Sequence, residues 1–184
     1  MTTKSFWGAV LTGLVLFVYG FIYWAVNPLP YLAWNDVDDM AATQSAAAQL
    51  FPEDGVYFLP GAGNDPEAMK LLETGPSVFL TIDHSPVAGP DPLSLAMGFM
   101  HNVFSALLLV FVLSGVSGHV ARITRAMIIG VVAAFVINGS EIIWWQQPVN
   151  WVAHQTIYYI IYFGIGAGVL HYFLDEPDGE TEAA

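Results

Sequence analysis

The chain has 184 residues, of which 55% are hydrophobic and only 11% carry a charged side chain. Soluble domains average about 25% charged residues, so this composition excludes an ordinary soluble domain and indicates a membrane protein. A net charge of -12 with four cations argues against nucleic-acid binding, and the absence of cysteine excludes disulfides and thiolate metal sites.

The first apolar segment runs from Phe6 to Val26 and is long enough to span a bilayer. Pro28 and Pro30 end it, because proline lacks the N–H that a helix needs. Its far end carries tyrosine, tryptophan and valine instead of the small residues of a cleavage site. Residues 1–26 therefore predict an uncleaved signal anchor.

Residues 27–92 are polar and predict a small α/β lobe between the first and second spans. Ten carboxylates lie between Asp36 and Asp91, against the single cation Lys70. The excess of negative charge favours solubility, or alternatively the docking of a basic extracytoplasmic protein. The expected helices are Asn35–Leu50, with Asn35 or Asp36 as N-cap, and Asp65 to about Glu73; the expected strands are Val56–Leu59 and Val78–Ile82.

Residues 93–174 predict a bundle of three further spans, followed by an acidic tail over residues 175–184. The expected spans are Leu93–Val116, Met127 to about Trp145, and Trp151–Leu174, joined by a connector over residues 118–125 and a turn over residues 146–150. The fold class is thus an all-α membrane protein. It has four transmembrane helices, with a small α/β extracytoplasmic lobe inserted between helices 1 and 2.

The few cations predict how the chain is oriented. Lys4, Arg122 and Arg125 should face the cytoplasm by the positive-inside rule. Both termini are then cytoplasmic and the lobe over residues 27–92 is extracytoplasmic. This topology is that of a multi-pass membrane protein in contact with lipid.

Glu141 is the only carboxylate in any of the apolar segments, and a charge in hydrocarbon is costly. Because intramembrane ionisable residues usually face the bundle interior and pair with one another, we expect Glu141 to contact His101 or His154. Several polar residues are expected at a similar depth: His101, Asn102, Asn138, Glu141, His154 and Gln155.

Three interpretations of these residues stay open. The first is a structural cluster that fixes helix register, formed by Asn102, Asn138, Glu141 and Gln155. The second is hydration near the lipid headgroups. The third is a site, since His101, Glu141 and His154 are residue types of a metal centre and could also hold a quinone or a haem propionate. The spacing supports no local metal motif.

Gly164 and Gly168 form a GxxxG pair in the last span, which favours close helix packing. Gly13 and Gly20 in the first span could receive this face within the chain. The alternative is that the pair docks onto a helix of another protein.

Several short motifs are similar to those of a known family. They are the segments Gly55–Gly61 (Gly-Val-Tyr-Phe-Leu-Pro-Gly) and Gly75–Phe79, and the pair Trp144-Trp145 followed by Pro148. With one span, a small outer lobe and three more spans, the chain resembles a family of uncharacterised short bacterial integral membrane proteins. The resemblance implies a bacterial inner-membrane protein without an assigned activity.

With no catalytic motif in the chain, the leading functional hypothesis is a non-catalytic accessory or assembly subunit. Its aromatic- and glycine-rich helices would join other integral membrane subunits in a larger complex, such as a respiratory or redox enzyme. One alternative is a metal- or quinone-binding membrane enzyme that uses His101, Glu141 and His154. Another is a small transporter or channel, which four spans could form only as an oligomer.

Overall fold

The computed structural model describes residues 1–61, 65–85, 89 and 91–176. The chain divides into two compact units, one made of Met1–Trp34 with Pro90–Ala184 and the other of Asn35–Gly89. Most of the acidic tail predicted over residues 175–184 lies outside the described residues, which end at Glu176.

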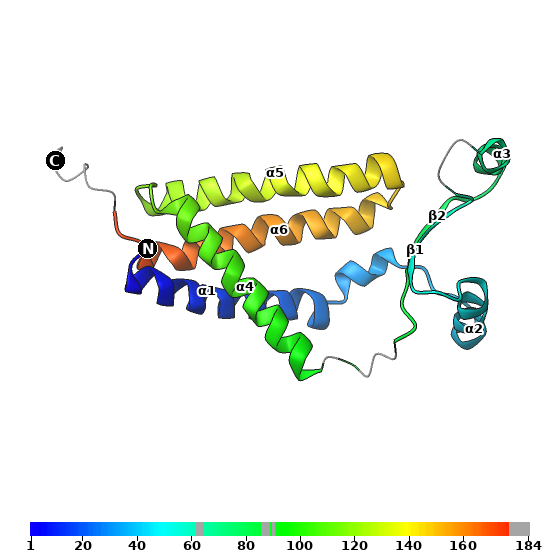
Figure 1. Cartoon of the computed structure of the whole chain (residues 1–184). Helices are drawn as coiled ribbons and strands as arrows, with labels where there is room; N and C mark the ends of the chain where they lie inside the picture. The colour runs from blue at the N-terminus through cyan, green and yellow to red at the C-terminus, as the bar shows by residue number, and fades with distance from the viewer. Residues whose placement is uncertain (62–64, 86–88, 90, 177–184) are drawn as a thin grey trace. The chain divides into compact units, whose positions relative to one another are not determined.

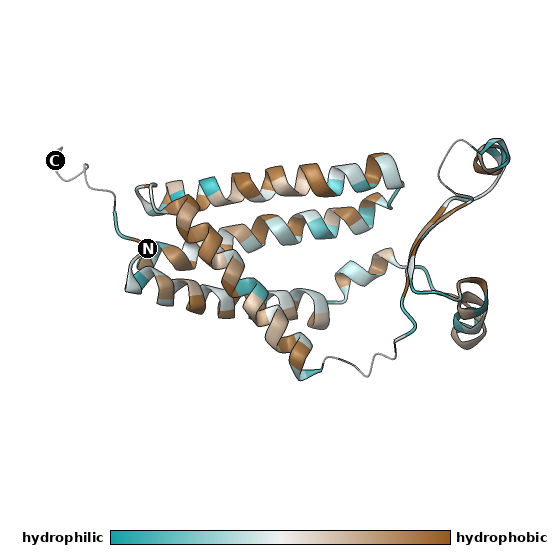
Figure 2. Cartoon of the chain, in the orientation of Figure 1, coloured by the Kyte–Doolittle hydropathy of each residue, from teal (hydrophilic) through white to brown (hydrophobic). Residues whose placement is uncertain are grey.

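Four helices of the first unit are long and apolar enough to cross a membrane, which confirms the prediction of four spans. Hydrophobic residues cover most sides of these helices (Figure 2), as is usual for segments surrounded by lipid. The helices are α1 (Thr3–Phe21, continued by the π-helical turn η1, Ile22–Val26), α4 (Pro92–Leu113), α5 (His119–Trp145) and α6 (Val149–Leu170, continued by the 3-10 turn η3, His171–Phe173).

The third span is longer than the sequence predicts. We expected it to begin near Met127, after a connector over residues 118–125, but α5 already begins at His119. Gly118 precedes it with a φ of 79°, a conformation that glycine adopts without steric cost. The Arg122 N–H donates to the Gly118 carbonyl at 3.1 Å, so Arg122 lies on the first turn of a helix and not in a loop.

The helices α1, α5 and α6 run side by side, whereas α4 crosses them obliquely (Figure 1). The most extensive packing joins α5 to α6 and α1 to α4, and α4 has little contact with α5. Gly13 allows the crossing of α1 and α4, because a Cβ at this position would lie 2.7 Å from the Val103 Cα.

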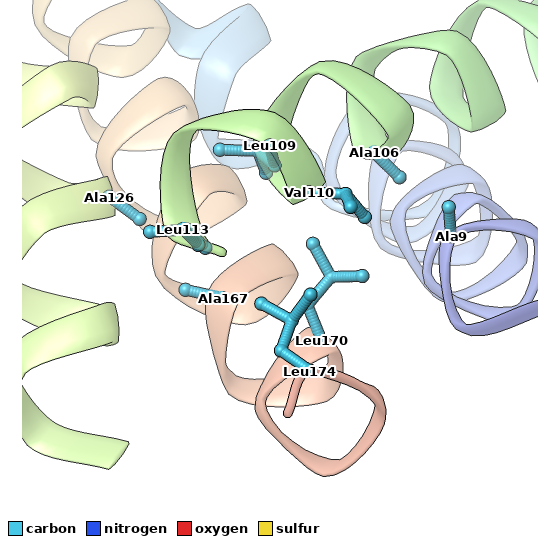
Figure 3. Packing of buried hydrophobic residues seen from close by; sticks show 9 residues of the cluster. All are labelled: Ala9, Ala106, Leu109, Val110, Leu113, Ala126, Ala167, Leu170 and Leu174. Carbon is cyan, nitrogen blue, oxygen red and sulfur yellow. The ribbon is translucent and has the colours of Figure 1, made fainter. Parts of the chain in front are cut away.

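The buried aliphatic core lies toward one end of this unit, where α1 and α5 begin and α4 and α6 end (Figure 3). Leucine and valine side chains of α4 and α6 fill it, and alanines of α1, α5 and α6 let the helices approach. Its members are Ala9, Ala106, Leu109, Val110, Leu113, Ala126, Ala167, Leu170 and Leu174.

The second unit contains two short helices and a two-stranded antiparallel sheet. Its elements are α2 (Met40–Leu50), β1 (Gly55–Leu59), α3 (Pro66–Thr74) and β2 (Val78–Ile82), with Gly55 opposite Ile82 and Leu59 opposite Val78. The sequence anticipates this order and the Asp65 N-cap of α3. The N-cap expected for α2 is wrong: the helix begins after Asp39, whose carboxylate accepts the Ala42 N–H at 2.9 Å.

Candidate functional site

The four long helices meet at two chemically different ends. We call one the arginine end, since it carries Arg122 and Arg125 near the start of α5. The opposite end carries Trp24 in η1, Trp145 at the end of α5 and Trp151 at the start of α6, and we call it the tryptophan end. The polar residues singled out by the sequence lie in the half of the unit nearer the tryptophan end.

Glu141 lies one turn before the end of α5. The helix stops at Gln146, which adopts a left-handed conformation with a φ of 54°. The Gln147 N–H then donates to the Glu141 carbonyl at 3.1 Å. Among the residues that the structure describes, none donates a hydrogen bond to the Glu141 carboxylate or forms an ion pair with it.

The half-buried Glu141 side chain lines a cavity of about 470 Å³ at the tryptophan end. This volume is within the range of small-molecule sites. Residues of η1, α5 and α6, together with the turn between α5 and α6, form the lining. They are Trp24, Ile137, Asn138, Glu141, Gln147, Trp151, Gln155, Tyr158 and Tyr159.

Aromatic rings form much of the wall of this cavity and pack on one another. The rings of Trp24 and Trp151 lie 5.8 Å apart, and those of Trp24 and Tyr158 lie 5.3 Å apart. Behind them, Tyr19 of α1 stacks on Tyr158 with centroids 5.2 Å apart and an angle of 6° between the rings. These contacts between α1, η1 and α6 give the wall a defined shape.

Amide side chains supply the remaining polar groups of the cavity. Asn138 is almost completely buried and donates from Nδ2 to the Thr156 hydroxyl at 2.9 Å, which joins α5 to α6. Gln147 and Gln155 also line the cavity. Three members of the predicted polar cluster, Asn138, Glu141 and Gln155, therefore share one cavity.

Asn102, the fourth member of the predicted cluster, lies in a separate pocket of about 180 Å³ between α4 and α6. It accepts a hydrogen bond from the Tyr162 hydroxyl at 2.9 Å and donates to the Gly98 carbonyl at 2.8 Å. His101 and Ser105 line the same pocket. The His101 side chain is exposed and has no hydrogen-bond partner in the described part of the chain.

The structure does not form the contact expected between Glu141 and a histidine. The Glu141 carboxylate lines one cavity and His101 lines another, and neither is lined by His154. His154 is fixed differently, since its carbonyl accepts the Tyr23 hydroxyl at 2.8 Å. The physical reason lies in the helix arrangement, because α4, which carries His101, packs mainly on α1 and not on α5.

The same separation bears on the metal hypothesis. Over residues 1–61, 65–85, 89 and 91–176, no three or more His, Cys, Asp or Glu side chains form a group that could hold a metal ion. His101, Glu141 and His154 all belong to these residues and are not brought together as a metal centre.

Gly164 and Gly168 face α5 within the chain. A Cβ on Gly164 would lie 3.4 Å from the Met127 side chain, and one on Gly168 would lie 3.9 Å from Ile123. Gly13 and Gly20 do not receive this pair, since Gly13 packs on Val103 of α4 and Gly20 lies near the Tyr158 hydroxyl. The pair thus has a packing role that needs no second protein.

Arg122 has a role that the predicted connector over residues 118–125 does not suggest. The Arg122 side chain is completely buried at the arginine end and lies within 3.2 Å of the Glu176 carboxylate. Its Nε donates to the Val116 carbonyl at 2.7 Å, and its Nη2 donates to the Asp175 carbonyl at 2.8 Å. Arg122 therefore joins the α4–α5 connection to the chain that follows α6.

The third nitrogen of this guanidinium completes the connection. Nη1 of Arg122 lies 3.0 Å from the His171 Nδ1, and 3.3 and 3.4 Å from the His171 and Leu174 carbonyls. The end of a helix exposes carbonyl groups with partial negative charge, which a guanidinium satisfies. Only the three-dimensional arrangement shows this role, because the carbonyls lie about fifty positions further along the sequence than Arg122.

Comparison of the chain with protein-family models, with curated proteins and with solved structures gives no match.

Proposed function

We propose that the protein is a non-catalytic accessory subunit of a larger membrane complex, and that it contacts its neighbour through the face of α4 that carries His101. The observation that supports this role is an exposed imidazole inside a membrane-spanning helix. His101 is nine residues from the start of α4, and a rise of 1.5 Å per residue places it about 14 Å along the helix.

A hydrocarbon core about 30 Å thick surrounds residues at such a depth, and lipid chains offer no hydrogen bond to an imidazole. Ser105 follows His101 by four residues on the same face of the helix, which extends the polar strip by one turn. This strip borders the pocket in which Asn102 is already satisfied by Tyr162. Ser105 already has a side-chain hydrogen bond with Tyr162, so His101 is the group that a polar side chain on a transmembrane helix of another polypeptide would satisfy.

The positive-inside rule gives the orientation of the protein in the membrane under this proposal. With Lys4, Arg122 and Arg125 in the cytoplasm, the tryptophan end and residues 27–92 face the other side of a bacterial inner membrane. The acidic residues of that segment then meet the extracytoplasmic space, where a basic protein would be attracted to them.

Photochemical cross-linking in native membranes tests the proposal. Benzoylphenylalanine replaces Phe104, which is 62% exposed and lies one turn after His101, and in a matched control it replaces Phe135 of α5, which is 81% exposed. We expect a cross-link from position 104 to a different membrane polypeptide, and lipid adducts alone from position 135. Replacing His101 with alanine should weaken the cross-link on the order of threefold to tenfold, as for one interhelical hydrogen bond.

Two results would overturn the proposal. Lipid adducts alone at both positions would show that α4 faces the bilayer. Cross-links between two copies of the chain at position 104 would show a homo-oligomer, which is the arrangement required by the transporter alternative.

A further inference from the structure

We propose that the cavity lined by Glu141, Trp24, Trp151, Tyr158 and Tyr159 binds an organic cation through its substituted ammonium group, with a trimethylammonium group as the preferred form. This inference does not depend on the proposed function. It concerns the tryptophan end of the first unit, not the exposed face of α4.

The cavity contains an uncompensated negative charge. Glu141 is half-buried near the end of a membrane-spanning helix, where a carboxylate without a partner is unfavourable. Neither His101 nor His154 pairs with it among the residues that the structure describes. The polar groups beside it are the uncharged amides of Asn138, Gln147 and Gln155. A cation in the cavity supplies the missing positive charge.

The aromatic wall of the cavity is suited to a cation. The faces of tryptophan and tyrosine rings attract cations within about 6 Å, and cages of such rings recognise quaternary ammonium groups. Two tryptophans and two tyrosines line this cavity together with one carboxylate. The centroids of Trp24 and Trp151, and of Tyr158 and Tyr159, lie 5.8 and 5.5 Å apart, so the rings form adjoining surfaces.

Membrane anchoring does not account for these rings. Aromatic residues that only mark the interface are exposed to the lipid headgroups, and Trp144, with 74% of its surface exposed, fits this description. Trp24, Trp151 and Tyr158, by contrast, are half-buried and contact one another. The neighbouring positions 144 and 145 show that α5 presents aromatic residues to the surroundings without using them in the cavity.

The lining of the cavity favours an organic cation over a metal ion. Calcium and magnesium ions need six or more oxygen ligands and bind more tightly as the number of charged ligands rises, whereas this cavity offers one carboxylate, three uncharged amides and ring faces. A trimethylammonium group carries its charge on methyl groups and has no N–H to satisfy, which suits aromatic faces. A volume of about 470 Å³ also holds such a group with part of the molecule attached to it. Free choline-like solutes and the headgroups of choline lipids share this chemistry.

Calorimetry of the purified full-length chain in an uncharged maltoside detergent tests the proposal. The probes are choline and 3,3-dimethylbutanol, its uncharged isostere with carbon in place of nitrogen. We expect choline to bind and the isostere to bind about tenfold more weakly or not at all, because only choline carries the charge. Equal binding of the two probes, or no binding of either, would overturn the proposal.

Matched variants locate the binding. Glu141→Gln and Trp151→Leu should each weaken choline binding by about tenfold. The controls Glu53→Gln, a carboxylate of the second unit, and Trp144→Phe, the exposed neighbour on α5, should leave it unchanged. If Glu141→Gln does not fold, Trp151→Leu decides, with gel filtration confirming its fold. Wild-type affinity in a folded cavity variant would contradict the assignment.

Nanodiscs distinguish the two sources of the ammonium group. Choline binding is compared in bilayers of phosphatidylglycerol alone and in bilayers with added phosphatidylcholine. If the added lipid displaces choline, the cavity takes lipid headgroups. If choline binds equally in both bilayers, the cavity takes a free solute. Failure of choline to bind in both bilayers and in detergent would overturn the site itself.

Discussion

The two ends of the long helices treat charge in opposite ways. At the arginine end, Arg122 is completely buried, and all three of its nitrogens find a carbonyl, a histidine or a carboxylate. At the tryptophan end, Glu141 is half-buried, and its carboxylate has no hydrogen-bond or ion-pair partner among the described residues. The aliphatic core surrounds the first end, and an aromatic cavity surrounds the second.

This difference between the two ends indicates that one end stabilises the fold and that the other is available to bind a ligand. A buried charge whose partners all come from its own chain holds that chain together, and breaking it is costly. A charge that its own chain leaves unpaired beside a cavity contributes little to folding and is available to a ligand. We therefore expect substitutions at the arginine end to change the free energy of unfolding, and substitutions at the tryptophan end to change binding.

The largest effect should come from Arg122→Ala. The substitution removes the guanidinium and leaves the Val116 and Asp175 carbonyls without their donor, so we expect a loss of about 3–5 kcal/mol in the free energy of unfolding. Steric-trap unfolding in bicelles measures it. Arg125→Ala is the control, since Arg125 is exposed and should change the value by no more than about 0.5 kcal/mol. Equal effects of the two substitutions would remove the contrast between the ends.

The next largest effect on the free energy of unfolding should come from a substitution at the crossing of α1 and α4. A Cβ on Gly13 would lie 2.6 Å from the Val103 side chain and 2.8 Å from its backbone nitrogen, so Gly13→Ala forces the helices apart. We expect a loss of about 1–3 kcal/mol in the free energy of unfolding. In Gly139→Ala, the new Cβ meets no atom within 4 Å, so this control should be neutral or stabilising by up to about 1 kcal/mol. A neutral Gly13→Ala would mean that close packing does not set the crossing.

The sequence predicts the four spans because length and hydropathy depend only on composition along the chain. It also predicts the order of elements in the second unit, where local signals such as the Asp65 N-cap act within a few residues. The ends of the helices are predicted less accurately than their order. The early start of α5 follows Gly118, and glycine is equally typical of a loop.

The candidate site depends on how each helix is rotated about its axis and tilted against its neighbours, which the composition of the chain does not predict. A similar depth in the membrane predicts a contact between Glu141 and His101. In the structure, however, α4 packs on α1 at Gly13, and His101 lines another pocket. Arg122 was missed for the related reason that its partners follow α6, far along the sequence. The aromatic residues around Glu141 are visible in the sequence as anchors, and only their ring contacts indicate a cavity.

Thr12 offers a smaller test inside the bundle. Its side chain is completely buried, and its hydroxyl has no hydrogen-bond partner among the described residues. Thr12→Val removes this unsatisfied group at nearly constant volume, so the free energy of unfolding should rise by about 1 kcal/mol. Thr12→Ser keeps the hydroxyl and loses a methyl group, so in this variant the free energy of unfolding should fall by about 0.8 kcal/mol. A loss of stability in the valine variant would show that the hydroxyl has a partner.

An exposed pair in the second unit contrasts with the buried Arg122. The Asp54 carboxylate accepts the His84 backbone N–H at 2.8 Å and lies 2.7 Å from the His84 Nδ1. The backbone hydrogen bond, and then the side-chain one, hold the pKa of Asp54 below its usual value. The pair therefore favours folding above the unfolded-state pKa of about 3.9, and this contribution is lost as the pH falls through the lower folded-state value.

Carbon NMR of the Asp54 carboxyl measures this titration. The midpoint should lie below about 3.9 at low salt and should rise with salt, which screens exposed pairs. In Asp54→Asn the His84 amide signal should lose its pH dependence in this range. A midpoint at or above the usual value would mean that the two hydrogen bonds do not persist in solution.

The smallest effect on stability should come from Glu141→Gln, and it tests the contrast between the ends most directly. Because the carboxylate has no hydrogen-bond or ion-pair partner in the described part of the chain, neutralising it breaks no such interaction. Since an unpaired carboxylate is unfavourable there, the free energy of unfolding should stay unchanged or rise by no more than about 0.5 kcal/mol, measured as for Arg122→Ala. A loss of several kcal/mol would show that Glu141 is paired within its own chain, as Arg122 is, and would leave no free carboxylate for a cation. Unchanged stability together with weakened choline binding would separate the two roles, since the same substitution then removes a ligand contact and no folding contact.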